Sequence, residues 1–168
     1  FVDLFVYELN QKDPPVGRVV VVQSTGGERA RAFGDRDGRY QVALRGLRDG
    51  RRIDETVQVE SVSRALTAAD SWDDVLEVAR GRWLEAIVSN TTEAGYALDP
   101  DEKAADSPPR SFPGKLLSVL RARFEAGLPG VSILPCELLD RNAERLLELV
   151  LQTARRWELS GASIDWIR

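Results

Sequence analysis

The stretch LEAIVSNTTE, residues 84–93, decides the fold, because a short apolar run passes directly into a row of polar residues. Leu84 to Ser89 has the length and composition of a strand with a buried end. The row that follows, Asn90-Thr91-Thr92-Glu93, is typical of a parallel strand that opens into a ligand-binding crevice. Ser, Thr and Asn also satisfy the backbone of ordinary loops, and for this row alone that interpretation is the more common one.

A second stretch, VSILPCE at residues 131–137, has the same design. Val131 to Leu134 predicts a strand, and Pro135-Cys136-Glu137 forms its exit. If the two strands are parallel, both exits open at the same edge of the sheet, which is the edge that binds nucleotides in doubly wound folds. The two exits together indicate a site more strongly than either does alone.

The rest of the chain alternates between the periods of strands and helices. The run RVVVVQ, Arg18 to Gln23, is rich in β-branched residues and predicts a strand buried on both faces. Alternating apolar residues on both sides of Asp49-Gly50 predict a β-hairpin in or beside the sheet. This alternation predicts an α/β fold with a mainly parallel sheet and an inserted hairpin. Apolar residues at helical spacing predict helices at Phe1 to Lys12, at Glu28 to Phe33, from Ser71 to Gly81, from about Lys115 to Gly127, and at Arg141 to Trp157.

Three local features accompany these elements. Ser71, followed by Trp72-Asp73-Asp74, predicts an N-cap in a variant of the capping box. Asp140 lies where the N-cap of the last long helix is expected, and capping is a more common role for it than ligand binding. The polar segment from Asp99 to Ser107 suggests a mobile loop.

Length, charge and residue composition limit the classes of function open to this chain. The 168 residues suit one domain, with no linker dividing them, and a net charge of -4 without a basic stripe argues against nucleic acid as a partner. No apolar run is long enough to span a bilayer or forms a signal peptide, which predicts a soluble protein.

The single cysteine, Cys136, cannot form an internal disulfide or a structural zinc site, so a reducing cytoplasm fits best. Histidine is absent, which excludes imidazole acid/base chemistry and histidine-bound metal within these residues.

The sequence also suggests that Phe1 lies inside a longer protein. It contains no methionine, and no residue precedes Phe1 that could cap the first predicted helix. A helix followed by the strand at Arg18 to Gln23 suggests half of a βαβ unit, whose first strand would lie upstream. Neither a GxGxxG nor a GxxxxGK[ST] pattern occurs, so these residues hold no complete phosphate-binding loop.

Individual candidates for chemistry are weak when taken alone. Cys136 lacks a histidine that could activate it as a nucleophile. Lys115 suits a catalytic role less well than a solvent-facing one, because it lies in the first turn of an amphipathic helix. Glu93 fits acid/base chemistry, and it fits equally the capping of backbone N–H groups.

Five blocks of the sequence carry a resemblance to a known family. They run from Val19 to Asn142, and the chain resembles the N-terminal domain of the tagaturonate reductase (altronate oxidoreductase) branch of the mannitol dehydrogenase family. The combination of SNTTEAG with ILPCEL and DRN is specific to this branch, whereas SFPGKL alone is not. The blocks are VVVVQSTGGERA, DGRYQVALRGL, VSNTTEAGYALDP, SPPRSFPGKL and SILPCELLDRN.

The resemblance implies a Rossmann-like N-terminal domain over residues 1–168, truncated at both ends and joined in the family to a helical C-terminal domain. It implies NAD-dependent interconversion of tagaturonate and altronate by hydride transfer. The family's Gly-rich GxGxFxRG loop would precede Phe1, and its catalytic lysine and histidine would follow Arg168, so these residues alone should be inactive.

The resemblance and the strand exits together identify candidate site residues. Two groups would bind the cofactor, one at the end of the Arg18 to Gln23 strand near the adenosine ribose and one at the Ser89 exit near the nicotinamide half. Three further residues are substrate-side candidates. The cofactor-binding candidates are Gln23, Ser24, Thr25, Asn90, Thr91 and Thr92, and the substrate-side candidates are Glu93, Glu137 and Asn142.

The sequence departs from the related patterns at two points. Mannitol dehydrogenases carry Cys-Asp-Asn at the exit matched here by Cys136-Glu137-Leu138, and Leu138 cannot donate the hydrogen bond that the Asn gives to the oxyanion. The strand ending in Gln23 lacks the acidic residue common in NAD sites, so NAD is retained because the resemblance implies it.

Three alternatives remain open at the level of sequence. The substrate could be fructuronate, or a ketohexose such as fructose as in mannitol 2-dehydrogenase. The chain could also be a non-catalytic α/β binding module, in line with the absent phosphate loop and histidine. The oligomeric state is not indicated.

Overall fold

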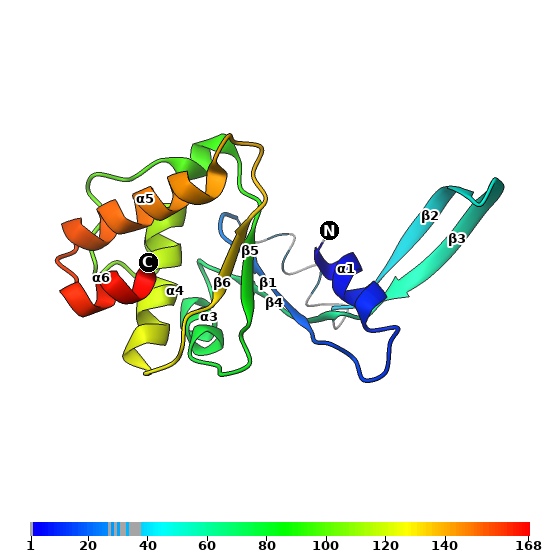
Figure 1. The fold of residues 1–168 in the computed structure, drawn as a ribbon, viewed down its shortest axis with the longest axis horizontal. Coiled ribbons are helices and arrows are strands. Elements are labelled where there is room, and N and C mark those ends of the chain that lie inside the picture. Colours follow the sequence, from blue (N-terminus) through cyan, green and yellow to red (C-terminus); the bar gives the residue numbers. More distant parts are fainter. Residues whose placement is uncertain (1, 27, 29, 31–32, 34–37) are drawn as a thin grey trace. The chain divides into compact units, whose positions relative to one another are not determined.

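A computed structural model describes residues 2–26, 28, 30, 33 and 38–168, which form two compact units (Figure 1). The first unit comprises residues 1–70 and the second residues 71–168, and each is described by itself. The short helix predicted at Glu28 to Phe33 falls largely outside the described residues. None of the helices in the described ranges has the length and apolar character needed to cross a membrane.

The first unit contains helix α1 and a pair of parallel strands. α1 spans Val2–Leu9, and β1, Val19–Gln23, pairs in parallel with β4, Val62–Thr67. The predicted strand at Arg18 to Gln23 is therefore confirmed, but its predicted burial on both faces is wrong. Val22 remains 41% exposed.

A hairpin completes the first unit. β2, Tyr40–Arg48, pairs antiparallel with β3, Arg51–Val59, from Tyr40↔Val59 to Arg48↔Arg51. Asp49 and Gly50 both have positive φ, 51° and 75°, as a tight two-residue turn requires. The predicted hairpin is confirmed, and it forms a two-stranded sheet of its own (Figure 1).

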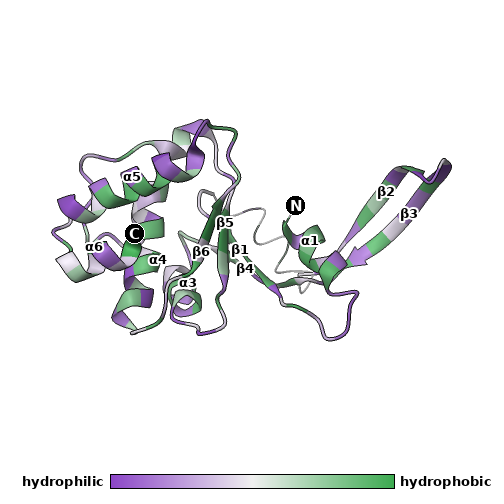
Figure 2. Ribbon diagram, viewed as in Figure 1, coloured by the Kyte–Doolittle hydropathy of each residue, from purple (hydrophilic) through white to green (hydrophobic). Residues whose placement is uncertain are grey.

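The second unit places helices against a short parallel sheet. β5, Ala86–Ser89, pairs in parallel with β6, Ser132–Pro135, and in Figure 2 both strands are mostly hydrophobic. Ile87 and Ile133 pack against a core cluster made by two helices. The cluster consists of Leu116, Leu117, Leu120, Leu146, Val150 and Ala154. The helices of this unit are α3 (Trp72–Ala79), the 3-10 helix η1 (Glu93–Tyr96), α4 (Phe112–Glu125), α5 (Asn142–Arg156) and α6 (Gly161–Ile167).

Helix caps depart from the predicted ones. Ser71 is the N-cap of α3, but its side chain makes no capping hydrogen bond, so the predicted capping box is not formed. The N-cap of α5 is Arg141 rather than Asp140, with a left-handed backbone at φ 51°. The α4 cap is regular, since Ser111 Oγ accepts from the N–H of Gly114 at 3.0 Å.

A buried arginine ties together the turns that precede β5 and β6. Arg123 on α4 is 2% exposed. Its Nε donates to Pro129 O at 2.7 Å, and its guanidinium donates to Ala79 O at 3.2 Å and to Gly81 O at 2.9 Å. Nε and Nη1 of the buried guanidinium are therefore paired with carbonyl oxygens at the end of α3, in the turn that follows it and in the turn after α4.

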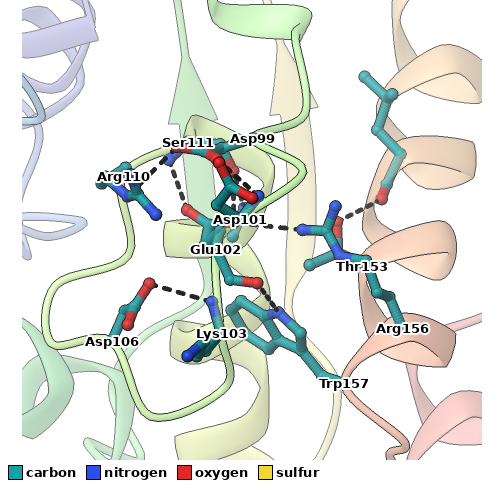
Figure 3. Close-up of polar contacts among 12 residues, drawn as sticks. Asp99, Asp101, Glu102, Lys103, Asp106, Arg110, Ser111, Thr153, Arg156 and Trp157 are labelled. Carbon is teal, nitrogen blue, oxygen red and sulfur yellow. Dashed lines mark hydrogen bonds and ion pairs between the residues drawn. The ribbon is translucent and has the colours of Figure 1, made fainter.

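The segment predicted to be a mobile loop is anchored by a second buried charge (Figure 3). Glu102 is 3% exposed and accepts hydrogen bonds from Ser111 N–H at 2.6 Å and Ser111 Oγ at 2.8 Å. Trp157 Nε1 donates to Glu102 O at 3.3 Å, and Arg156 lies 3.9 Å from the carboxylate. The loop is thereby attached to the N-terminus of α4 and to the C-terminal end of α5.

This anchor leaves no room for a side chain at Gly114. A Cβ there would lie 2.7 Å from Cδ of Glu102 and closer still to Oε2. Glycine-to-alanine changes inside helices normally stabilise by about 1 kcal/mol. At Gly114 we expect the opposite sign, because Glu102 is buried and overpacking costs about 1–3 kcal/mol.

Urea unfolding followed by circular dichroism tests this expectation. Gly114→Ala should lower the free energy of unfolding, whereas Gly161→Ala, where nothing lies within 4 Å of the added Cβ, should not. A Gly114→Ala protein as stable as the parent would contradict the packing described around Glu102.

Candidate functional site

The exits of β5 and β6 lie side by side. The strands run parallel in the register Ala86↔Ser132 to Ser89↔Pro135, and the N–H of Cys136 donates to Ser89 O at 2.8 Å, one step beyond the strands. The prediction that both polar exits open at the same edge of a sheet is therefore confirmed.

Glu137 links the two exits through both of its carboxylate oxygens. It is 4% exposed and lies directly after β6. Its Oε1 accepts from the Thr91 N–H at 3.0 Å and lies 3.4 Å from Thr91 Oγ1, and its Oε2 accepts from the Tyr96 hydroxyl at 3.0 Å. The side chain that the sequence placed on the substrate side is thus bonded to the loop that follows β5.

The charge states of Glu137 and Tyr96 follow from these contacts. Burial raises the pKa of the Glu137 carboxyl, but the hydrogen bonds to the carboxylate, that from the Thr91 N–H foremost, together outweigh it and leave the pKa below its usual value. Burial and the hydrogen bond to Glu137 raise the pKa of the Tyr96 hydroxyl. The pair is therefore a stable anion with a neutral donor at neutral pH, and this arrangement suits holding a loop better than moving a proton.

The side chains of the polar row after β5 do not all face the same way. Thr91 is partly buried against Glu137, whereas Asn90 and Thr92 on either side of it are exposed. Glu93 is exposed and begins η1. Asn90 and Thr92 offer a neutral amide and a hydroxyl at the open edge.

Residues after β6 have distinct roles. The Asn142 amide donates to Pro135 O and to Glu137 O, both at 3.0 Å, and so fixes the turn that leads into α5. Leu138 is 98% exposed and presents an apolar side chain at the edge. Cys136 is exposed, with its sulfur 3.7 Å from Leu134 O.

The predicted residues at the end of β1 belong to the first unit. Gln23 Nε2 donates to Thr25 O at 2.8 Å, and Gln23 Oε1 accepts from the N–H of Ala30 at 2.9 Å, so this side chain closes its own turn. Ser24 is half-buried and Thr25 is exposed. Their joint action with Asn90 to Thr92 in cofactor binding stays a prediction.

Lys115 is less open to solvent than its position suggested. It is half-buried, and its Nζ donates to Arg110 O at 2.8 Å. Burial lowers the pKa of its amine, against the opposing charge of Glu102. The Lys115 amine is thus tied to the loop before α4 instead of the exits of the strands.

Tyr96 belongs to the site but is not among the residues that the sequence predicts for it. Its hydroxyl bonds to Glu137, which lies 41 residues away in the chain, and no local pattern reveals such a pair. The one available signal was an aromatic residue with a polar tip inside the conspicuous stretch after β5. Within the described residues no group of three or more Cys, Asp and Glu side chains is placed to hold a metal ion.

Comparisons with known proteins give a consistent picture, although no family model matches the chain. It is 36% identical over 171 residues to the altronate oxidoreductase of Bacillus subtilis (strain 168), covering 99% of the chain and 36% of that protein. For the altronate oxidoreductase of Yersinia pestis the identity is 37% over 172 residues, covering 99% of the chain and 36% of the relative. The chain thus spans about a third of the length of these relatives.

Solved structures confirm the predicted Rossmann-type α/β fold. The Pseudomonas fluorescens mannitol 2-dehydrogenase, solved as a ternary complex with NAD and D-mannitol, matches 99% of the chain and 36% of its own length with a TM-score of 0.80. A D-sorbitol dehydrogenase in substrate-free form matches 97% of the chain and 36% of its own length with a TM-score of 0.75. Both are 20% identical in sequence, so they show the fold alone.

The bonds of Glu137 predict a dependence of stability on pH. Glu137→Gln should lower the free energy of unfolding near pH 7 by about 1.5–3 kcal/mol, the usual value of hydrogen bonds to a charged group. The pKa of Glu137 is lower in the folded protein than in the unfolded chain. Its contribution is therefore present above the unfolded value of about 4.3 and is lost as the pH falls through the folded value.

Urea unfolding of both proteins between pH 3 and pH 7 measures this effect. The stability difference between parent and variant should be constant near neutral pH and should shrink below about pH 4. Glu77→Gln, at an exposed carboxylate on α3, provides the control. A difference for Glu137→Gln that does not change with pH would show that the carboxylate charge is not what stabilises the loop.

Proposed function

We propose that the chain belongs to the altronate oxidoreductase family, which it resembles over 99% of its length, and that the protein is an NAD-dependent oxidoreductase that interconverts tagaturonate and altronate by hydride transfer. The observation that carries the proposal is the relationship over 99% of the chain to altronate oxidoreductases at about 36% identity. Because the chain spans only about a third of those relatives, the activity is proposed for the intact protein.

The geometry of the β5 and β6 exits supports a cofactor site. Ligands of open α/β sheets bind outside the carboxyl ends of the strands. Asn90 and Thr92 are exposed at that edge and carry neutral hydrogen-bonding groups, which suit a nicotinamide or a ribose better than they suit a phosphate. The bound cofactor would supply the hydride, and the work of this part of the chain would be to bind and orient it.

The assignment of the cofactor residues keeps the two groups derived from the sequence. Asn90, Thr91 and Thr92 would lie on the nicotinamide side, with Thr91 acting through its bond to Glu137. Gln23 to Thr25 would lie near the adenosine ribose, and the Gln23 side chain already orders that turn. NAD is further supported by the bound NAD named for the mannitol 2-dehydrogenase structure.

Altronate and tagaturonate are preferred as substrates because the relatives are altronate oxidoreductases. A polyol such as mannitol is the second candidate, favoured by the likeness to mannitol and sorbitol dehydrogenase structures. Leu138 counts against a mannitol-type site, since its exposed apolar side chain cannot give the oxyanion the hydrogen bond that the matching Asn of mannitol dehydrogenases gives. We place the enzyme in the cytoplasm, where its single exposed Cys136 would stay reduced.

NADH oxidation by the intact protein tests the substrate assignment. Tagaturonate, fructuronate and fructose are offered side by side, and kcat/KM is measured for each. We expect the value for tagaturonate to exceed the other two at least tenfold, about 1.4 kcal/mol of transition-state preference. Activity with fructose alone would move the protein to the polyol enzymes, and activity with none of the three would refute the proposed function.

Asn90→Ala tests the cofactor-side assignment. Loss of one hydrogen bond to the cofactor should raise the Kd for NADH about tenfold, which corresponds to about 1.4 kcal/mol. The measurement is a titration of NADH fluorescence on the intact protein. Thr56→Ala, an exposed change on β3, should leave the Kd unchanged. Equal affinities of the Asn90→Ala protein and its parent would remove Asn90 from the site.

A further inference from the structure

We propose that Glu137 is a positioning residue, whose buried carboxylate holds Thr91 and Tyr96 and thereby turns Asn90 and Thr92 toward the cofactor. This inference rests on the proposed function, because it concerns the same edge of the sheet. It assigns Glu137 to the support of the site, although its place after β6 would equally suit a residue that contacts substrate.

The carboxylate clamps both ends of one short segment. Oε1 faces Thr91 at the beginning of residues 91–96 and Oε2 faces Tyr96 at the end, each with a 3.0 Å hydrogen bond. The donors lie 46 and 41 residues away from Glu137 in the chain, so the clamp joins two separate exits. Fixing both ends restricts the conformations of the residues between them.

The segment is closely folded around Thr91. Gly95 N–H donates to Thr92 O at 2.8 Å, and a Cβ at Gly95 would lie 2.7 Å from Cβ of Thr91. Only glycine therefore fits at position 95, where the backbone lies against the Thr91 side chain. Thr91 is consequently packed between Gly95 and the Glu137 carboxylate.

The inward direction of Thr91 decides the direction of its neighbours. Along an extended backbone successive side chains point to opposite sides. Thr92 has extended backbone angles, φ -80° and ψ 167°, and both Asn90 and Thr92 are exposed while Thr91 is partly buried. Holding Thr91 on Glu137 therefore presents its two neighbours at the open edge.

Glu137 is itself held in place. The Asn142 amide donates to Glu137 O and to Pro135 O, so the backbone that carries the carboxylate is fixed from α5. If the residues at the open edge are already ordered before the cofactor binds, binding loses no free energy to ordering them. The clamp should therefore contribute to cofactor affinity without touching the cofactor.

Glu137→Gln is a sharp test, because it keeps the size of the side chain and removes one acceptor. A glutamine has one carbonyl oxygen, so it accepts from the Thr91 N–H only if its NH2 group donates to the Tyr96 hydroxyl, and both bonds then lose the carboxylate charge that strengthens them. Tyr96→Phe removes one end of the clamp and keeps the carboxylate. Both variants are made in the intact protein.

Two readouts are measured. Hydrogen exchange of peptides covering residues 90–96, without cofactor, should become at least tenfold faster in Glu137→Gln and change less in Tyr96→Phe. The Kd for NADH should rise at least fivefold, while kcat at saturating NADH stays within about threefold of the parent, because bound cofactor restores the order of the row.

Two matched controls separate positioning from general stability. Glu102→Gln alters the other buried carboxylate of the same unit, and Tyr40→Phe removes a second tyrosine–carboxylate pair, that of Tyr40 with Asp3. Both should lower stability and leave the exchange of residues 90–96 and the Kd for NADH unchanged.

The outcomes discriminate clearly. Unchanged exchange and Kd in Glu137→Gln would overturn the proposal, and so would an equal loss of NADH affinity in Glu102→Gln. If Glu137→Gln fails to fold, Tyr96→Phe decides by the same two readouts. If the parent protein itself does not bind NADH, the proposed function fails, and faster exchange in Glu137→Gln would still show that the clamp orders the row.

Discussion

The guanidinium of Arg123, buried and hydrogen-bonded to backbone carbonyls, fixes the start of the strand pair on which the candidate site stands. Its donors are paired with the carbonyl oxygens of Ala79, Gly81 and Pro129. These carbonyls lie at the end of α3 and in the turns before β5 and β6. A buried charge keeps its place only while its donors are satisfied, so Arg123 holds both turns in one arrangement. The amino ends of the two strands are thereby set together.

Glu137 holds the carboxyl ends of the same two strands together. β5 and β6 have only four residues each, so backbone pairing between them gives a short ladder. Arg123 ties the turns before the strands, and Glu137 ties the loops after them through Thr91 and Tyr96. The buried cation Arg123 at one end of the strands and the buried anion Glu137 at the other thus hold together a strand pair whose own backbone ladder is short.

The sequence predicted those features that depend on local periodicity and missed those that depend on distant partners. β5, β6, α4 and α5 were predicted because apolar spacing alone indicates them, and the adjacency of the exits follows once the strands are parallel. β4 was missed, because VSRALT follows the hairpin closely and carries an arginine in a short run. The partners of Glu137 and Glu102 have no local signature, since each carboxylate looks like an ordinary polar loop residue until the fold buries it.

Both exits repeat one pattern, and that pattern explains how a polar row serves structure and binding together. In Asn90-Thr91-Thr92 and in Cys136-Glu137-Leu138 the middle residue turns inward and its neighbours are exposed. The two middle residues bond to each other, so the exits are joined on the inside while four side chains stay on the open edge. A change at Glu137 therefore acts on the order of the edge, whereas a change at Leu138 acts on the surface offered to a ligand. If the proposed function holds, cofactor affinity would thus depend on the order set by Glu137, and substrate preference on the surface presented by Leu138.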